Sequence, residues 1–314
     1  MRNKSITLNR PWEKLTEEFI RNLNKRETTK HAYKEALRNW VDFIGAENLT
    51  LSVEDIETYK TRLVDRKYSP YTINLYLTAL KIFFDYLVRI DHIQSNPAEK
   101  IERKQRPKSR RDCLTEDEFF KLLQLEQLRA DSDLRDRAIL VLKMCTGLRD
   151  ISLVLADVGD IQVKSGQPVL YYQGKGRDTK DEFVILTKRP FEAINEYLSR
   201  RPAAKPADPL FVSTSKRNFN QRVTTKTMGR VVKKFYKRAN IIRPGIKPHS
   251  LRHTAVTFSL LGGADITQVK DMAGHKSIET TIGYRHNLER MTDPAEMYVE
   301  RYIDKNLKSK SKQS

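Results

Sequence analysis

The segment from residue 248 to residue 286 has the sequence PHSLRHTAVTFSLLGGADITQVKDMAGHKSIETTIGYRH. Its apolar residues recur every three or four positions between clear stop signals, which predicts a series of short helices. Gly262-Gly263 ends the first helix, and Gly274 ends the second. Histidine, arginine and tyrosine stand at the breaks, where side chains of different helices can converge. The expected helices are 251–261, 266–273 capped by Asp265, and 278–284 capped by Ser277.

The stretch before this segment mixes helices with a β-hairpin. A capping box at Thr115–Glu118 starts one helix, and a second helix over 134–145 stops at Thr146-Gly147. Two stretches rich in β-branched and aromatic residues flank Gly174-Lys175-Gly176 and predict a hairpin. The expected strands are 169–172 and 183–187, and the expected further helices are 190–200 and 224–239.

The N-terminal part predicts four amphipathic helices that share one apolar core. The third begins at Ser52, with Asp55 in the reciprocal capping position, and Ser69-Pro70 separates it from the fourth. The expected helices are 12–24, 29–44, one beginning at residue 52, and 71–90.

A basic segment separates these helices from the rest of the chain. Between Glu99 and Arg111 apolar residues nearly vanish, and Lys and Arg accumulate around Pro107. This predicts an interdomain linker, either lying along phosphates or simply solvated. The expected organisation is a helical domain over 11–98, a basic linker over 99–112, a second domain over 113–290, and a C-terminal segment over 291–314 with a helix over 295–307 and a basic tail.

The charge of the chain favours a polyanionic partner. Its 314 residues include 59 Lys and Arg against 40 Asp and Glu, a formal net charge of +19. Nucleic acid is the first candidate, with a merely solvated basic surface as the alternative. No segment is apolar enough for a membrane span or a signal sequence, so a cytoplasmic protein is expected. Two cysteines, Cys113 and Cys145, provide neither a disulfide framework nor a thiolate metal site.

The residues at the chain breaks suit phosphodiester chemistry. Metal-free transfer requires cations for the non-bridging oxygens, a nucleophile, a base, and an acid for the leaving oxygen. Arginine fits the first task, because its planar, permanently charged group matches phosphate. Each candidate alone is more often structural, so the argument rests on order and spacing. The candidates are Arg149, His249, Arg252, His275 and Tyr284.

The order of these residues resembles the tyrosine site-specific recombinases, also called the phage integrase family. Members have an Arg after Thr-Gly-Leu, a Lys in a Gly-Lys-Gly hairpin, a His-x-Leu-Arg-His segment, a Gly-His pair and a downstream Tyr. The matching residues here are Arg149, Lys175, His249, Arg252, His275 and Tyr284. The resemblance covers nearly the whole chain. It implies a mainly α fold with a small β-hairpin or sheet, in which a four-helix, SAM-like core-binding domain precedes an α+β catalytic domain.

The resemblance also implies an activity, that of a site-specific recombinase that cuts and rejoins DNA through a 3′-phosphotyrosine. Tyr284 would be the nucleophile and His249 its base, because a phenol with a pKa of about 10 is a poor nucleophile at neutral pH. His253, one turn beyond His249, is expected to pack or to support the site from behind. The scissile phosphate would be held by Arg149, Arg252 and His275, and Lys175 would protonate the departing 5′ oxygen.

Cofactors and partners follow from the same resemblance. No metal, ATP or other cofactor is expected, because the phosphotyrosine conserves the bond energy. The expected partners are double-stranded DNA with specific core sites and further copies of the chain, forming a homo-tetramer around a Holliday junction, with accessory proteins in some systems. The C-terminal helix is similar to the segment that members donate to a neighbouring subunit. Only about ten residues precede the first helix, which favours a simple two-domain recombinase of the resolution or mobile-element type.

Three positions depart from the common pattern. Ser152 stands where many members have a Glu, Ala273 replaces a frequent Leu before Gly-His, and Asp178 lies where a second basic residue is common. These departures affect the surroundings of Arg149 and the hairpin. They leave every catalytic position filled.

Three other functions stay open from the sequence. A type IB topoisomerase would use similar chemistry, although the C-terminal helix argues against it. A metal-dependent hydrolase with His249, His253 and His275 as ligands would lack the Glu of a His-Glu-x-x-His pair, since Ser250 stands there. The third is a DNA-binding protein that has lost catalysis, and the presence of a suitable residue at every catalytic position argues against it.

Overall fold

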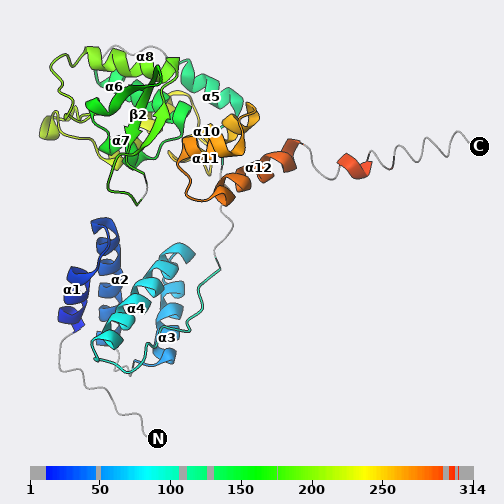
Figure 1. Cartoon of the computed structure of the whole chain (residues 1–314). Helices are drawn as coiled ribbons and strands as arrows, with labels where there is room; N and C mark the ends of the chain where they lie inside the picture. The colour runs from blue at the N-terminus through cyan, green and yellow to red at the C-terminus, as the bar shows by residue number, and fades with distance from the viewer. Residues whose placement is uncertain are drawn as a thin grey trace, which may run out of the picture. The chain divides into compact units, whose positions relative to one another are not determined.

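The computed structural model describes residues 12–46, 51–105, 112–125, 131–174, 176–292, 297–300 and 303 (Figure 1). The chain divides into two compact units, residues 1–109 and 110–314. It is mainly helical with a small antiparallel sheet, so the predicted fold class is confirmed. Within the described parts of the chain, no helix is both long and apolar enough to cross a membrane.

The N-terminal unit is a four-helix domain, as predicted. Aromatic side chains fill its core, where Trp40 meets Tyr59 and Phe84 edge to face, and burying each such ring stabilises the fold by about 1.5–3 kcal/mol. Ser52 and Asp55 form the expected capping box. The helices are α1 (Trp12–Asn22), α2 (Glu27–Ala46), α3 (Val53–Asp65) and α4 (Pro70–Arg89).

The chain after α4 returns along that helix instead of leaving it. The side chain of Asn74, which is 1% exposed, accepts the Lys104 N–H and donates to the Lys104 carbonyl, both at 2.8 Å. Asn96 donates to the Lys81 carbonyl at 2.9 Å. Ile101 packs against the core of the unit. The first part of the predicted linker therefore lies on α4, and residues 106–111 fall outside the described residues.

The C-terminal unit surrounds a buried central helix, α6 (Asp131–Thr146), which packs against α8, α9 and α10. Its apolar run from Ala138 to Leu142 is buried on all sides, as expected of a helix that lacks a polar face. The other helices are α5 (Glu116–Leu123), α7 (Asp150–Leu155), α8 (Lys188–Ser199), α9 (Thr225–Arg238), α10 (Ser250–Leu261), α11 (Ile266–Ala273) and α12 (Ile278–Thr292), with short 3₁₀ turns at Val158–Asp160 and Lys216–Asn218.

The sheet has three antiparallel strands in the order β1 (Ile161–Lys164), β2 (Gln167–Tyr172), β3 (Glu182–Ile185). The predicted hairpin corresponds to β2 and β3, with Leu170 opposite Val184. The sequence did not predict β1, because that strand is solvated and shows no alternation of buried and exposed residues; Val163 is 76% exposed.

The last described long helix differs from the prediction. We expected it to end at Tyr284, but α12 continues to Thr292. The physical reason is that no Gly or Pro follows Gly283 until Asp293-Pro294, so nothing stops the helix earlier. The predicted helix over 295–307 falls largely outside the described residues, of which 297–300 and 303 are helical.

Candidate active site

Arg149 lies in the short loop that joins α6 to α7. Gly147 turns the chain there with a φ of +63°, a conformation that strains residues with a side chain. Arg149 then occupies the position just before α7, and its Nη1 donates to the Gly274 carbonyl at 3.1 Å. The loop after α6 is thereby joined to the end of α11.

Arg252 reaches the same place from α10. It is 4% exposed and donates to the Gly147 carbonyl at 2.7 Å and to the Ala273 carbonyl at 2.6 Å. Burial, and then the positive charge of Arg149, lower the pKa of Arg252 to about 10. Because this value is still far above neutral pH, two guanidinium charges stand side by side, an arrangement that favours binding of an anion.

Gly274 lies in the turn whose main-chain carbonyls accept from both arginines, Gly274 from Arg149 and Ala273 from Arg252. It adopts the left-handed conformation at the end of α11, with a φ of +58°. A Cβ at this position would lie 2.8 Å from the Tyr172 hydroxyl and 3.0 Å from Glu182 Oε2. His275 follows, 8% exposed, and its Nδ1 lies 2.9 Å from Thr281 Oγ1. The hydrogen bond with Thr281 fixes the ring orientation of His275.

Tyr284 projects from α12 into a small apolar cluster with Val256, Val269 and Ala273. It is 5% exposed. Its ring stacks nearly parallel to that of His275, with centroids 6.2 Å apart. Its hydroxyl is hydrogen-bonded to Nδ1 of His253. The phenol is therefore held by a histidine of α10.

His249, the residue just before α10, and His253, within that helix, lie against each other. The rings of His249 and His253 are perpendicular, with centroids 4.8 Å apart. Packing of neighbouring protein around the imidazole, and then the charges of Arg252 and Lys143, lower the pKa of His249, although the residue keeps an exposed side. A lowered pKa leaves His249 neutral and able to accept a proton at neutral pH.

Lys175 lies outside the described residues. The hairpin on either side of it is described. Gly176 has a φ of +79°, and Arg177 pairs with Asp181 and Glu182. Asp178, one of the departures noted in the sequence, is exposed.

The other two departures are structurally accommodated. Ser152 is 2% exposed and donates its hydroxyl to the Gln173 carbonyl at 3.0 Å, which ties α7 to the end of β2. Ala273 contributes through its main chain, since its carbonyl accepts from Arg252. Its small side chain is buried in the cluster around Tyr284.

A hollow of about 940 Å³ lies beside this site, between β3 and α11. It is lined by Tyr172, Glu182, Gly274 and His275 together with the side chains of β3, but not by Arg149, Arg252 or Tyr284. The hollow is therefore distinct from the place where the two arginines and the tyrosine converge.

The metal-site alternative finds no ligand set in the described parts of the chain. No group of three His, Cys, Asp or Glu side chains in them lies close enough together to hold a metal ion. His249, His253 and His275 are thus not assembled as ligands. His253 contacts Tyr284, and His275 contacts Thr281.

The structure brings together Arg149, Arg252, His275 and Tyr284, with His249 near the arginines. Sequence reasoning missed the contact between His253 and Tyr284 and the support of His275 by Thr281. A signal existed for His253, because its spacing of four from His249 puts both on one face of α10. Nothing in the sequence distinguishes Thr281 from its neighbour Thr280.

Comparison with known proteins gives matches over both units. Residues 112–291 match the model of the phage integrase family, and residues 13–94 match the phage integrase N-terminal SAM-like domain. The tyrosine recombinase XerC of Pelobacter propionicus is 30% identical over 88% of this chain and 90% of its own length. The tyrosine recombinase XerD of Oceanobacillus iheyensis is 28% identical over 83% and 88%.

A solved structure has the same fold. The XerH site-specific recombinase bound to its difH substrate, in a pre-cleavage complex, superposes with a TM-score of 0.69 at 17% identity, covering 93% of this chain and 98% of that one. The match extends over nearly the full length of both proteins.

Proposed function

The chain belongs to the phage integrase family and is a tyrosine recombinase, and from this premise we propose that Tyr284 is the nucleophile with which it cuts and rejoins DNA at specific sites. The observation that carries this proposal is the convergence of Arg149, Arg252, His275 and Tyr284 on the turn at Gly274. These four residues come from the α6–α7 loop, α10, the turn after α11, and α12. The fold therefore brings the charges of Arg149 and Arg252 close to the buried phenol of Tyr284, although these residues are far apart in the sequence.

The proposed reaction exchanges one phosphoester for another. The Tyr284 oxygen attacks the scissile phosphorus, a 3′-phosphotyrosine forms, and the bond to the 5′ oxygen breaks. The phenolic proton passes to His249, and Lys175 supplies a proton to the departing 5′ oxygen. Attack by the 5′ hydroxyl of another strand reverses these steps and releases Tyr284. One phosphoester bond forms for each one that breaks, so the reaction needs no nucleotide. The proton that His249 accepts is matched by the proton that Lys175 donates, so no metal is needed to balance the charges.

The two arginines would stabilise the transition state. The two non-bridging oxygens share one negative charge in the diester and develop further charge as phosphorus becomes five-coordinate. Guanidinium groups already fixed by main-chain carbonyls need little reorganisation to meet that charge. Arg252 is fixed at both Gly147 and Ala273, and Arg149 at Gly274. Removing one such donor commonly lowers the rate by about 100- to 1,000-fold.

The proposed partners are duplex DNA and further copies of the chain. The net charge of +19 supports binding to the DNA backbone, and the XerH site-specific recombinase was solved bound to its difH substrate. We propose that four copies pair two sites through a Holliday junction, and that the described helical unit, the basic segment and the C-terminal segment serve core binding, backbone contact and subunit exchange. The proposed compartment is the cytoplasm.

A covalent adduct tests the proposed nucleophile. Genomic fragments selected by binding to the protein would be nicked at successive positions across the bound region, because a nick next to the cleavage position lets the cut strand diffuse away and the adduct accumulate. The parent should give a DNA-linked band on a denaturing gel, with or without EDTA, and Tyr284→Phe should give none. Tyr171→Phe is the matched control, because Tyr171 packs on Phe183 of the sheet. An adduct from Tyr284→Phe, or none from the parent, contradicts the proposal.

A further inference from the structure

The last turn of α6 contains a buried lysine that the proposed reaction does not use. Lys143 is 2% exposed, and its ammonium group forms an ion pair with Asp150, whose side chain is 29% exposed. A buried ammonium group is unfavourable unless a partner compensates its lost hydration. A buried lysine does not contribute to solubility, so Lys143 is expected to have a role within the fold or the site.

The pair spans the loop that carries Arg149. Lys143 lies one turn before the end of α6, and its carbonyl accepts the Gly147 N–H at 3.0 Å. Asp150 is the first residue of α7, directly after Arg149. The ion pair therefore joins the two chain segments between which residues 147–149 turn. Together with the bond from Arg252 to the Gly147 carbonyl, it limits where Arg149 can lie.

The same two charges act on His249. Lys143 opposes protonation of the imidazole and Asp150 favours it. His253 also faces His249, ring against ring, from the next turn of α10. Among the residues that the structure describes, the charged and titratable groups facing His249 are Arg252 and His253 of α10, Lys143 of α6, Arg149 of the loop and Asp150 of α7. Among these, Asp150 brings the negative charge.

We propose that Lys143 and Asp150 are positioning residues of this site, which hold the Arg149 loop in place and balance the charge around His249. The proposal rests on the proposed function in taking His249 as the base. Neither residue needs to touch DNA. The pair acts through Arg149, by restricting its loop, and through His249, by its electrostatic field.

Neutralising Lys143 or Asp150 one at a time should shift the pKa of His249 in opposite directions. Asp150→Asn removes a negative charge, so the protonated imidazole is less favoured and the pKa of His249 falls. Lys143→Met removes a positive charge, and the pKa of His249 rises. Since the neutral imidazole accepts the proton, adduct formation increases as pH rises through this pKa. The acid limb of the pH profile should move by about 0.5 unit, toward lower pH for Asp150→Asn and toward higher pH for Lys143→Met.

The experiment measures adduct formation against pH for the parent, both single variants and the double variant Lys143→Met/Asp150→Asn. We expect the acid limb of the pH profile to move in opposite directions in the two single variants and to lie near that of the parent in the double variant. The plateau rate should be about tenfold or more below the parent in all three variants, because the Arg149 loop is looser. NMR titration of His249 in the DNA-free proteins, with the signal identified through His249→Gln, measures the same pKa without catalysis.

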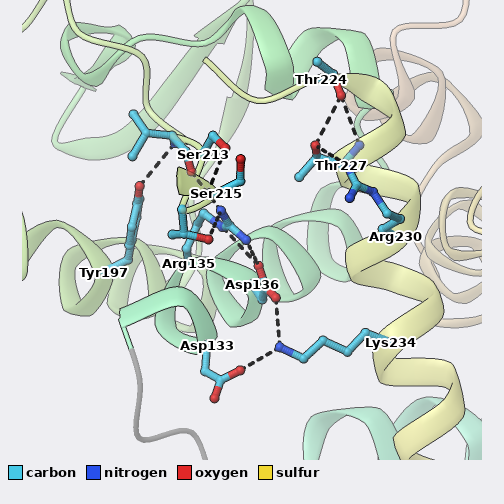
Figure 2. A network of polar contacts seen from close by, with 12 residues as sticks. Asp133, Arg135, Asp136, Tyr197, Ser213, Ser215, Thr224, Thr227, Arg230 and Lys234 are labelled. Carbon is cyan, nitrogen blue, oxygen red and sulfur yellow. Dashed lines mark hydrogen bonds and ion pairs between the residues drawn. The ribbon is translucent and has the colours of Figure 1, made fainter. Parts of the chain in front are cut away.

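A matched control separates this effect from general damage to α6. Lys234 pairs with Asp133 and Asp136 at 2.7 and 3.0 Å near the other end of that helix (Figure 2), and it is not among the charges that act on His249. Lys234→Met should leave the acid limb and the His249 titration unchanged. The inference is overturned if both single variants move the His249 titration in the same direction, or if neither moves it. A parent that forms no adduct would instead refute the proposed function.

Discussion

Arg252 donates to two main-chain carbonyls that lie far apart in the sequence, those of Gly147 and Ala273. A guanidinium group can do this and still present further N–H groups to a phosphate, whereas an ammonium group concentrates its donors at one point. Arg149 makes one such bond, to Gly274. Both arginines are therefore expected to hold the fold together and to bind phosphate, and Arg252, with two carbonyl bonds, has the larger structural role.

Lysine substitutions should separate the effect of each arginine on stability from its effect on adduct formation. Arg252→Lys loses two buried hydrogen bonds, so we expect unfolding to be easier by about 2–3 kcal/mol and adduct formation to fall by about 100-fold or more. Arg149→Lys should lower adduct formation to a similar degree with a smaller change in stability, because its one carbonyl bond is less buried. Thermal melting and the adduct assay check both values. Wild-type rates in either variant would show that the fork of the guanidinium is dispensable.

His249 and His253, at the start of α10, should differ in their effect on cleavage. His249→Gln removes the proposed base, and we expect adduct formation to fall by about 100-fold or more. His253→Gln keeps a polar group near the Tyr284 hydroxyl, and the expected loss is about tenfold, the value of one hydrogen bond. Single-turnover rates on the nicked substrate measure both. A larger loss for His253→Gln would transfer the role of base to His253.

Arg149 and His275 could be predicted from the sequence because each follows a recognisable helix stop, whereas Tyr284 was expected at a helix end and lies inside α12. Arg149 follows Gly147, and His275 follows Gly274. The contact between His253 and Tyr284 could not be predicted, because it depends on how α10 packs against α12. No local pattern encodes that packing. The same holds for the buried pair of Lys143 and Asp150, whose partners belong to different elements.

At the scale of elements, most helices were predicted within a few residues, since their apolar periodicity and caps are strong, but the short helix α7 (Asp150–Leu155) was not predicted. The expected helix 266–273 matches α11 at both ends, because Asp265 and Gly274 bound it. The strand β1 was missed because it buries no alternating face. The helix α12 was predicted too short because Gly283 and Tyr284 were taken as its end, although a single Gly inside a periodic helix does not stop it.

The turn at Gly274 should not tolerate a side chain. Gly274→Ala would place a Cβ 2.8 Å from the Tyr172 hydroxyl, in a backbone conformation that alanine rarely adopts. We expect the turn to shift and to carry with it the carbonyl that accepts from Arg149, so that adduct formation falls by about tenfold or more. Gly263→Ala, also left-handed but with nothing within 4 Å of the added Cβ, is the control for backbone strain alone. Equal losses in both variants would mean that the contacts at Gly274 are unimportant.

The hold of Asn74 on Lys104 can be tested by proteolysis. Asn74→Ala removes both hydrogen bonds to the Lys104 main chain, so we expect residues 99–105 to leave α4 and trypsin to cleave after Arg103 or Lys104 several times faster. Asn195→Ala, in α8 of the other unit, is the control. Unchanged cleavage at these sites would show that Ile101 and Asn96 hold the segment without Asn74.

At the scale of the whole molecule, the excess of basic residues predicts binding governed by phosphate contacts. With roughly six to ten contacts, affinity for DNA should fall by about 10³- to 10⁵-fold between about 50 and 200 mM salt. Fluorescence anisotropy with labelled duplex measures the slope. His249→Gln should preserve it, because the imidazole is neutral at neutral pH. A flat salt dependence would contradict a binding surface built from the charge of +19.

The central claim, that Tyr284 becomes joined to the 3′ phosphate of the cut strand, is tested most directly by mapping the adduct. The parent, trapped on the nicked substrate, would be digested with nuclease and protease, and the peptide carrying the residual nucleotide sequenced by mass spectrometry. The account predicts one modified peptide with the nucleotide on Tyr284, and a free 5′ hydroxyl on the released strand. A nucleotide on another residue, or a 5′ phosphate linkage to the protein, would contradict it.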